Sequence, residues 1–448
     1  MTAATSNSLD AIRFALRASD VPDSATLLGR AAGDETFVWE QPAAGVSIVG
    51  IGAARSIEVA GRSRFVRADA ATRELFAGLA VRGDTAPPEA GPLLVGGFAF
   101  GHHAAPGVAW RGFPPGRLVL PRLLVVRRGD RAWATLVGQS PGRASGEREL
   151  RTLLRGSRPA TPAAEGADAK PTPEFRATAD RPHAHFQELV ASALAAIGRG
   201  EFEKVVVARS ARLLHSAAFS AAEVLALLRR THPSSTTFGV ARRGGAAFVG
   251  ATPERLVRLR DGCVEAAAVA GSAPRGLTPE EDDRLARALR ESKKEQVEHA
   301  IVVRAVREAL ANDCAPLHAP ESPGLCRLDG IQHLETPVTG TLRSARSVLR
   351  LVERLHPTPA VGGAPSEAAL AWLERHEGLE RGWYAGPIGW VDATGDGEFA
   401  VALRCALLRG REARLFAGAG IVEGSEPEPE LYETRLKFRA FLGPLLEI

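Results

Sequence analysis

Short apolar runs separated by turn residues constrain the fold of this chain more than any other feature. In the first third they cover residues 45–52, 93–100, 118–126 and 132–137. Later they return at residues 204–212, 236–241, 246–250, 255–260 and 264–269, with Arg-Gly-Gly and Asp-Gly turns among the last four. Such short turns join neighbouring antiparallel strands, whereas parallel strands need long crossovers. The pattern predicts an antiparallel meander and argues against a doubly wound fold.

Helical periodicity is confined to a few segments. Apolar residues recur at helical spacing over residues 186–197, and Gly200 supplies a stop. Residues 278–312 open with Thr-Pro-Glu-Glu, which offers an N-cap hydroxyl, a first-turn proline and a capping-box glutamate, so we expect one long helix. A last helix is expected from Ser425 to residue 442, after a hairpin over Val391 and residues 399–408 and a strand at residues 415–422. Together these segments predict an α+β fold, with large antiparallel sheets flanked by outer helices.

One segment has no apolar periodicity. Residues 156–174 are rich in Pro, Ala, Gly and Ser, which is typical of a solvated linker or a long surface loop. It separates an N-terminal sheet portion, residues 1–155, from a larger portion, residues 175–448.

The overall composition excludes several classes of protein. The 448 residues carry 56 basic and 52 acidic side chains, and a net charge of +4 argues against a nucleic-acid partner. There is no apolar run of about 18 residues and no signal-peptide pattern, so we expect a soluble, cytoplasmic protein without a membrane partner. The four cysteines form no Cys-x-x-Cys pair, so neither a disulfide framework nor a zinc site is indicated.

Two expected helices each carry a Glu-x-x-Glu pattern, Glu295/Glu298 and Glu430/Glu433. This spacing places both carboxylates of a pair on one helix face, about one turn apart. Oxygen ligands from two helices, without histidine or cysteine, favour Mg²⁺ over zinc or iron. The alternative is a pair of solvated helix faces, on which Lys437 and Glu433 form an ordinary i,i+4 pair.

Lysine is scarce, since only five of the 56 basic residues are lysines. Lys204 begins a strand with three consecutive valines. An amine can lose its proton where a guanidinium cannot, so a lysine in an apolar strand is a candidate for such a role. The alternative is a lysine that snorkels from the strand end to solvent. Glu254 ends another expected strand, where the simplest interpretation is a turn carboxylate.

A third pattern suits an anion. Gly418-Ala419-Gly420 closes a strand, and such small residues let backbone N–H groups approach an anionic group. Arg404 on the preceding strand would complete a clamp for a carboxylate. In a chain with 46 glycines, Gly-x-Gly alone is not specific.

Assembled in order, these segments resemble the chorismate-utilising enzymes: isochorismate synthase, salicylate synthase, the large subunit of anthranilate synthase and aminodeoxychorismate synthase. The matching stretches run through most of residues 186–445. They include Lys204-Val-Val-Val-Ala-Arg, Gly250-Ala-Thr-Pro-Glu-Arg, Ala270-Gly-Ser-Ala-Pro-Arg-Gly, Lys294-Glu-Gln-Val-Glu-His and Ile331-Gln-His-Leu. They continue with His356-Pro-Thr-Pro-Ala-Val-Gly-Gly, Tyr384-Ala-Gly-Pro-Ile-Gly, Val401-Ala-Leu-Arg, Ala417-Gly-Ala-Gly-Ile-Val and residues 430–437. The N-terminal portion matches chiefly at Gly96-Gly-Phe-Ala-Phe-Gly.

The resemblance implies one chorismate-binding domain over residues 1–448, made of two large antiparallel sheets with the active site between them. The resemblance implies that Glu298 and Glu433 are direct Mg²⁺ ligands and that Glu295 and Glu430 hold metal-bound waters. The substrate contacts it implies are Gly271, Ser272 and Lys437 at the ring carboxylate, Tyr384, Arg404 and the backbone of Gly418, Ala419 and Gly420 at the pyruvyl carboxylate, and His356 along the ring.

The implied reaction adds a nucleophile at C2 of chorismate and removes the C4 hydroxyl, which requires a base and an acid. By resemblance, Lys204 activates water and Glu254 protonates the departing hydroxyl. Both roles suit groups whose pKa is shifted by burial and by neighbouring charges.

Three positions favour isochorismate synthase, an isomerase, within the family. Lys204 stands where enzymes that use ammonia usually have glutamine, and Ala270 stands where aminodeoxychorismate synthases carry a nucleophilic lysine. Ala360 stands where salicylate synthases, which also eliminate pyruvate, typically carry threonine. Salicylate synthase is the alternative.

A catalytically silent binding protein on the same fold is a more distant alternative, because the expected base, acid and metal-ligand positions are all filled. Chorismate is the expected small-molecule partner. We expect a monomer without a glutamine amidotransferase subunit. The chain does not indicate whether the isochorismate serves menaquinone, siderophore or salicylate synthesis.

Overall fold

The computed structural model describes residues 9–31, 33–102, 107–139, 141–155, 175–328 and 330–445. The linker expected at residues 156–174 lies outside these ranges. Among the strand pairs within them, only β1 (Asp10–Arg17) with β4 (Ala80–Gly83) is parallel, and every other pair is antiparallel. The α+β class with large antiparallel sheets is therefore confirmed.

The strand pairs form two branches that meet at β6 (Gly116–Arg128). The first branch runs through β5 (Leu93–Phe98), β18 (Pro387–Asp392), β19 (Gly397–Val401), β12 (Arg255–Arg260), β13 (Cys263–Pro274) and β16 (Ile331–Leu342), and β14 (Cys314–His318) and β15 (Gly324–Arg327) pair with β16. The second branch runs through β3 (Val46–Glu58), β2 (Thr36–Gln41), β10 (Thr236–Ala241), β11 (Ala246–Thr252), β20 (Cys405–Arg409), β21 (Glu412–Ile421) and β9 (Lys204–His215), and β8 (Phe175–Ala179) and β17 (Gly363–Ala364) pair with β9. β7 (Arg131–Gly138) joins β6 to β1.

Two of these pairs connect the N-terminal portion to the rest of the chain. In β2–β10, Trp39 lies opposite Phe238, and in β5–β18, Gly96 lies opposite Gly389. Because both sheet branches need strands from both portions, we propose that residues 1–448 form one domain.

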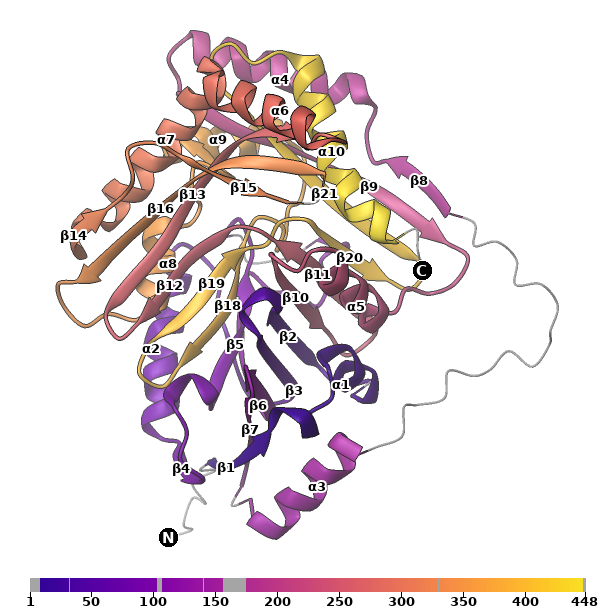
Figure 1. Ribbon diagram of the computed structural model, residues 1–448, viewed down its shortest axis with the longest axis vertical. Helices are drawn as coiled ribbons and strands as arrows, with labels where there is room; N and C mark the ends of the chain where they lie inside the picture. Colours follow the sequence, from indigo (N-terminus) through magenta and orange to yellow (C-terminus); the bar gives the residue numbers. More distant parts are fainter. Residues whose placement is uncertain are drawn as a thin grey trace.

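Helices cover the strands from outside. In Figure 1, α4 (His183–Gly198), α6 (Pro279–Glu291), α7 (Lys293–Ala311), α9 (Ser366–His376) and α10 (Pro427–Leu445) gather at the top, above β9, β21 and β13. The remaining helices are α1 (Ser24–Arg30), α2 (Arg64–Ala77), α3 (Arg143–Arg155), α5 (Ala221–Thr231) and α8 (Val348–Leu355). Within the described ranges, no helix is long and apolar enough to cross a membrane.

The expected helix at residues 278–312 is wrong as one unit, because it breaks at Ser292. This residue has ψ 116° and ends α6, and its hydroxyl accepts a hydrogen bond from the backbone N–H of Glu295. Ser292-Lys-Lys-Glu295 is a capping-box spacing, so a new helix begins here. The break places Glu295 in the first turn of α7.

The expected meander and the last hairpin are each interrupted where the chain crosses between branches. β11 pairs with strands of the second branch, whereas β12 pairs with strands of the first branch. Pro253 lies between them and has no N–H to donate to a neighbouring strand, so the chain leaves the second branch here. The strand expected at residues 399–408 breaks into β19 and β20 near Arg404, whose φ is +47°. The two crossings are joined by backbone hydrogen bonds from Val401 N–H to Glu254 O and from Ala251 N–H to Arg404 O.

Candidate active site

A pocket lies where the two branches face each other beside the crossings. Its walls come from β9 and β21 in the second branch, from β13 and β16 in the first, and from both crossings. The lining residues are Val206, Pro253, Glu254, Val269, Ala270, Gly271, Ser272, Glu298, His333, Ala360, Val361, Tyr384, Leu403, Arg404, Phe416, Ala417, Gly418, Gly420, Glu433 and Lys437. The fold therefore collects most of the site residues expected from the sequence around one space.

Lys204 does not snorkel to solvent. Its side chain is 0% exposed, and its Nζ lies 2.9 Å from Oε1 of Glu298 on α7. Gly420 on the neighbouring strand makes this approach possible, because a Cβ there would lie 2.1 Å from Glu298 Oε1 and 3.0 Å from Lys204 Cε. A glycine on β21 thus admits an ion pair formed by β9 and α7.

Glu254 is a buried acid rather than a turn carboxylate, with 4% of its surface exposed. Burial raises the pKa of its carboxyl to about 8, although the ammonium groups of Lys204 and Lys437 act to lower it. At neutral pH the group is therefore mostly protonated and can donate a proton into the pocket.

Each of the four glutamates in the two Glu-x-x-Glu patterns forms an ion pair with a lysine. Nζ of Lys294 lies 2.7 Å from Glu430 Oε1 and 3.2 Å from Glu295 Oε1, so it bridges the two helices. Nζ of Lys437 lies 2.6 Å from Glu433 Oε1. With Lys204 on Glu298, three of the five lysines in the chain neutralise this acidic cluster.

The pKa shifts indicate how close the carboxylates are to one another. Burial and the charge of Glu298 raise the pKa of Glu295, and burial and Glu433 raise that of Glu430 to about 7. Burial also disfavours ionised Glu433, but Lys437 and Lys294 hold its pKa below the usual value. Among the described residues, no three His, Cys, Asp or Glu side chains are grouped as metal ligands.

The oxygen-only donors nevertheless fit a hard divalent cation. The charges of Glu298 and Glu433 raise the pKa of Glu295, and the charge of Glu433 raises that of Glu430, so these carboxylates repel one another, and such a cation would relieve the repulsion.

Gly271 shapes the pocket beside this cluster. It lies in a bulge of β13 against β16, and its φ of +78° favours glycine. A Cβ there would lie 3.0 Å from Glu295 Oε2, and this oxygen accepts a hydrogen bond of 3.0 Å from Ser272 N–H. The bulge therefore turns the Ser272 amide toward Glu295.

His333 is a functional candidate that the sequence analysis did not single out, although it lies in the quoted Ile331-Gln-His-Leu stretch. Its Nε2 lies 3.1 Å from Arg404 Nη2, and its Nδ1 lies 3.0 Å from Ser272 Oγ and 3.2 Å from Gly271 O. Arginine only donates, so Nε2 accepts and Nδ1 carries the proton. Burial and the charge of Arg404 lower the pKa of His333 to about 3, so a neutral imidazole joins the two ends of the pocket.

Gly418 and Gly420 face the pocket, whereas Ala419 does not. β20 pairs with β21 only as far as Leu415, so in the described part of the chain the following residues have one edge free of strand partners. Lys437 Nζ donates to Gly418 O at 2.7 Å across that edge. In a strand, the N–H and C=O of one residue point to the same side, so the Gly418 and Gly420 amides face this edge and the Ala419 amide faces β9. The expectation for Ala419 is therefore corrected.

His356 also lies away from the pocket. Its Nε2 lies 3.1 Å from Phe100 O, and its ring packs against Phe65 and Phe100. Burial lowers the pKa of His356 to about 3, so it is neutral. The pocket wall instead includes Ala360, four residues further on, and the buried Tyr384. The expectation that His356 lies along the substrate ring is therefore corrected, because its imidazole packs against Phe65 and Phe100.

Comparisons with known proteins find relatives of this chain over most of its length. Residues 4–446 match a family model described as chorismate binding enzyme. The chain is 40% identical over 416 residues to the salicylate biosynthesis isochorismate synthase of Pseudomonas aeruginosa, covering 92% of this chain and 84% of the relative. It is 36% identical to isochorismate synthase MenF of Bacillus subtilis, covering 79% of this chain and 75% of the relative.

Solved structures are similar over nearly the whole chain. The menaquinone-specific isochorismate synthase MenF of Escherichia coli matches with a TM-score of 0.78 and 28% identity, over 98% of this chain and 94% of that one. An isochorismate synthase described as putative and 2,3-dihydroxybenzoate-specific, DhbC from Bacillus anthracis, matches with a TM-score of 0.74 and 28% identity, over 94% of this chain and 99% of that one. The chain belongs to the chorismate-binding enzyme family.

Proposed function

We propose that this protein is an isochorismate synthase, which converts chorismate to isochorismate by adding water at C2 and releasing the C4 hydroxyl. One observation carries the proposal: a single pocket holds a carboxyl group that is protonated at neutral pH, Glu254, and reaches the buried Lys204–Glu298 pair. A reaction that deprotonates water and expels hydroxide needs an acid and a base.

In this proposal Lys204 is the base and Glu254 the acid. A lysine amine can serve as a base where an arginine cannot, because a guanidinium keeps its proton in proteins. Glu254, protonated at neutral pH, has a proton to give to the leaving hydroxyl. The hydrogen bond from Val401 N–H to Glu254 O holds the backbone from which this carboxyl extends into the pocket.

The acidic cluster is proposed to bind Mg²⁺, with Glu298 and Glu433 as direct ligands and Glu295 and Glu430 holding its waters. When bound, the cation supplies the positive charge that attracts the ring carboxylate of chorismate. Lys437 and the backbone of Gly271 and Ser272 lie beside the cluster and are suited to the same carboxylate.

The pyruvyl carboxylate is proposed to bind at the other side of the pocket. Arg404 offers a guanidinium, Tyr384 a buried hydroxyl, and Gly418 and Gly420 offer backbone N–H groups from the free edge of β21. His333 holds Arg404 through its neutral Nε2, which fixes the direction of the remaining guanidinium donors.

Product analysis tests the proposal. Purified protein is incubated with chorismate and Mg²⁺, the ring products are identified by ¹H NMR, and pyruvate is assayed separately. We expect isochorismate in equilibrium with chorismate and no matching release of pyruvate. Salicylate with stoichiometric pyruvate would establish salicylate synthase instead, and no turnover would favour a silent binding protein.

The remaining expectations stay predictions. Cell fractionation tests the cytoplasmic location, and light scattering tests the monomer without an amidotransferase subunit. The relatives serve salicylate, menaquinone and 2,3-dihydroxybenzoate routes, so neighbouring genes would decide the pathway.

A further inference from the structure

A buried ion pair lies behind the pocket and does not line it. Glu377 and Arg381 follow α9, with 5% and 4% of their surfaces exposed. Arg381 Nε donates to Glu377 Oε2 at 2.8 Å, and its Nη2 donates to Oε1 at 2.5 Å. The guanidinium also stacks 4.2 Å above the ring of Phe100. Removing two charges from water is costly, so the further hydrogen bonds of these two groups decide what the pair contributes.

The pair fills a gap in the edge of β9 directly after Lys204. Among the described residues, this edge pairs with β17 only at Lys204 and Val205 and with β8 only from Ala211 onward. Between these strands, Arg381 Nη2 donates to Val206 O at 2.7 Å, and Ala208 N–H donates to Glu377 Oε1 at 2.8 Å. The two side chains thus take the place of a strand and satisfy buried backbone groups that would otherwise be unpaired.

The same guanidinium reaches two further parts of the site. Arg381 Nη1 donates to Val361 O at 2.7 Å, next to Ala360 in the pocket wall. The backbone O of Arg381 accepts from Tyr384 N–H at 3.0 Å. One residue therefore connects the strand of Lys204, the segment with Ala360 and the turn that carries Tyr384.

We infer that Arg381 and Glu377 are positioning residues for the reaction: they hold the strand of Lys204, the Ala360–Val361 wall and Tyr384 in register without touching the substrate. The hydrogen bonds of the pair do not depend on which reaction the protein catalyses. The effect of the pair on catalysis rests on the function proposed above. A misplacement of about 1 Å costs an enzyme up to roughly 100-fold in rate. A lysine at 381 is a single point charge and cannot serve Glu377, Val206 and Val361 together.

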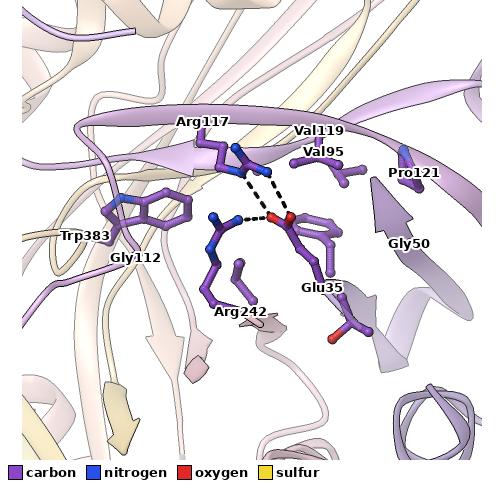
Figure 2. A pocket seen from close by; sticks show the side chains of 14 residues that line it. Glu35, Gly50, Val95, Gly112, Arg117, Val119, Pro121, Arg242 and Trp383 are labelled. Atoms are coloured by element: carbon purple, nitrogen blue, oxygen red, sulfur yellow. Dashed lines mark hydrogen bonds and ion pairs between the residues drawn. The ribbon is translucent and has the colours of Figure 1, made fainter. Parts of the chain in front are cut away.

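The pair Arg117–Glu35 in the N-terminal portion provides a matched control. Arg117 donates two hydrogen bonds, of 3.0 and 2.9 Å, to the carboxylate of Glu35, and Arg242 forms an ion pair with the same carboxylate (Figure 2). Arg117 is 9% exposed, so Arg117→Lys disturbs a similar bidentate pair outside the candidate active site. The same substitution in the two pairs therefore separates loss of stability from loss of positioning.

The experiment compares Arg381→Lys, Arg117→Lys and wild type by thermal unfolding, by kcat and KM, and by hydrogen exchange of residues 204–210. We expect both variants to melt earlier, but only Arg381→Lys to lose about 10- to 100-fold in kcat and to exchange faster at residues 204–210. Glu377→Gln, which keeps an acceptor for Ala208, repeats the test if Arg381→Lys does not fold.

Three results would overturn the inference: unchanged exchange at residues 204–210, faster exchange with unchanged kcat, or equal loss of kcat in Arg381→Lys and Arg117→Lys. Failure of the wild type to convert chorismate would refute the proposed function instead. In that case the exchange measurement still decides whether the pair holds β9.

Discussion

The ammonium of Lys204 lies 2.9 Å from the carboxylate of Glu298, and the lysine is fully buried. The residues come from a strand and a helix, and Gly420 on β21 leaves them the room to meet. A buried pair of this kind is weak evidence of stability, since its desolvation cost offsets its attraction. Its position beside a pocket that also holds a protonated Glu254 favours a chemical role.

Lys204→Ala should lower kcat by about 10²- to 10⁴-fold, the usual contribution of a general base. Chorismate binding should change little, because the contacts proposed for its carboxylates do not include Lys204. Steady-state kinetics and calorimetric titration measure the two effects. Lys293→Ala removes an exposed lysine and should retain normal kcat. A fully active Lys204→Ala would refute the assignment of the base.

Activity should fall as pH rises through about 8, because Glu254 then loses the proton that it donates. Its pKa is raised from 4.5, so the folded protein holds a proton that the unfolded chain releases, and stability should decrease between about pH 4.5 and 8. In Glu254→Gln both the alkaline fall in kcat and this part of the stability change should disappear, and kcat should be about 10²- to 10⁴-fold lower. Kinetics and denaturant unfolding measured across pH check the prediction. Wild-type pH profiles of kcat and stability in Glu254→Gln would contradict it.

Gly420→Ala should damage the site although it adds one methyl group. The new Cβ would lie 2.1 Å from Glu298 Oε1, so the Lys204–Glu298 pair must move. We expect kcat to fall at least about tenfold, since catalysis tolerates little misplacement. Gly198→Ala on α4, where a Cβ meets nothing within 4 Å, is the control and should stay active. Equal activities in both variants would count against the importance of the pair.

Glu433→Gln should weaken Mg²⁺ binding by at least about tenfold. The variant removes one proposed ligand and leaves Lys437 without its carboxylate, so it should also melt earlier. Calorimetry measures the affinity without reference to turnover, and chelation of Mg²⁺ should abolish activity of the wild type. Glu423→Gln, at an exposed glutamate, should bind Mg²⁺ normally. Unchanged Mg²⁺ affinity in Glu433→Gln would place the metal elsewhere.

Local patterns predicted most of the core strands and the two Glu-x-x-Glu helix faces. β10 and β12 have the predicted bounds, because short apolar runs between turn residues have few other solutions. α2 was not predicted, since charged and small residues dominate it and only a few apolar side chains, such as Phe65 and Phe76, pack inward.

The errors concern features that depend on tertiary contacts. Arg404 keeps a φ of +47° because it lies where the chain crosses between branches, and no local pattern indicates that conformation. His356 is the first residue of a family-like motif, but its ring packs against Phe65 and Phe100 instead of lining the pocket. The roles of Arg381 and Glu377 arise because two neighbouring strands stop short of each other along β9, which a linear sequence does not display.

The most direct test of the central claim is to run the wild-type reaction in ¹⁸O-water with chorismate and Mg²⁺ and to locate the label by mass spectrometry and NMR. Water activation by Lys204 predicts isochorismate with one ¹⁸O at C2, formed without stoichiometric pyruvate. Unlabelled isochorismate would contradict addition of water, and salicylate with an equal amount of pyruvate would contradict an isochorismate synthase.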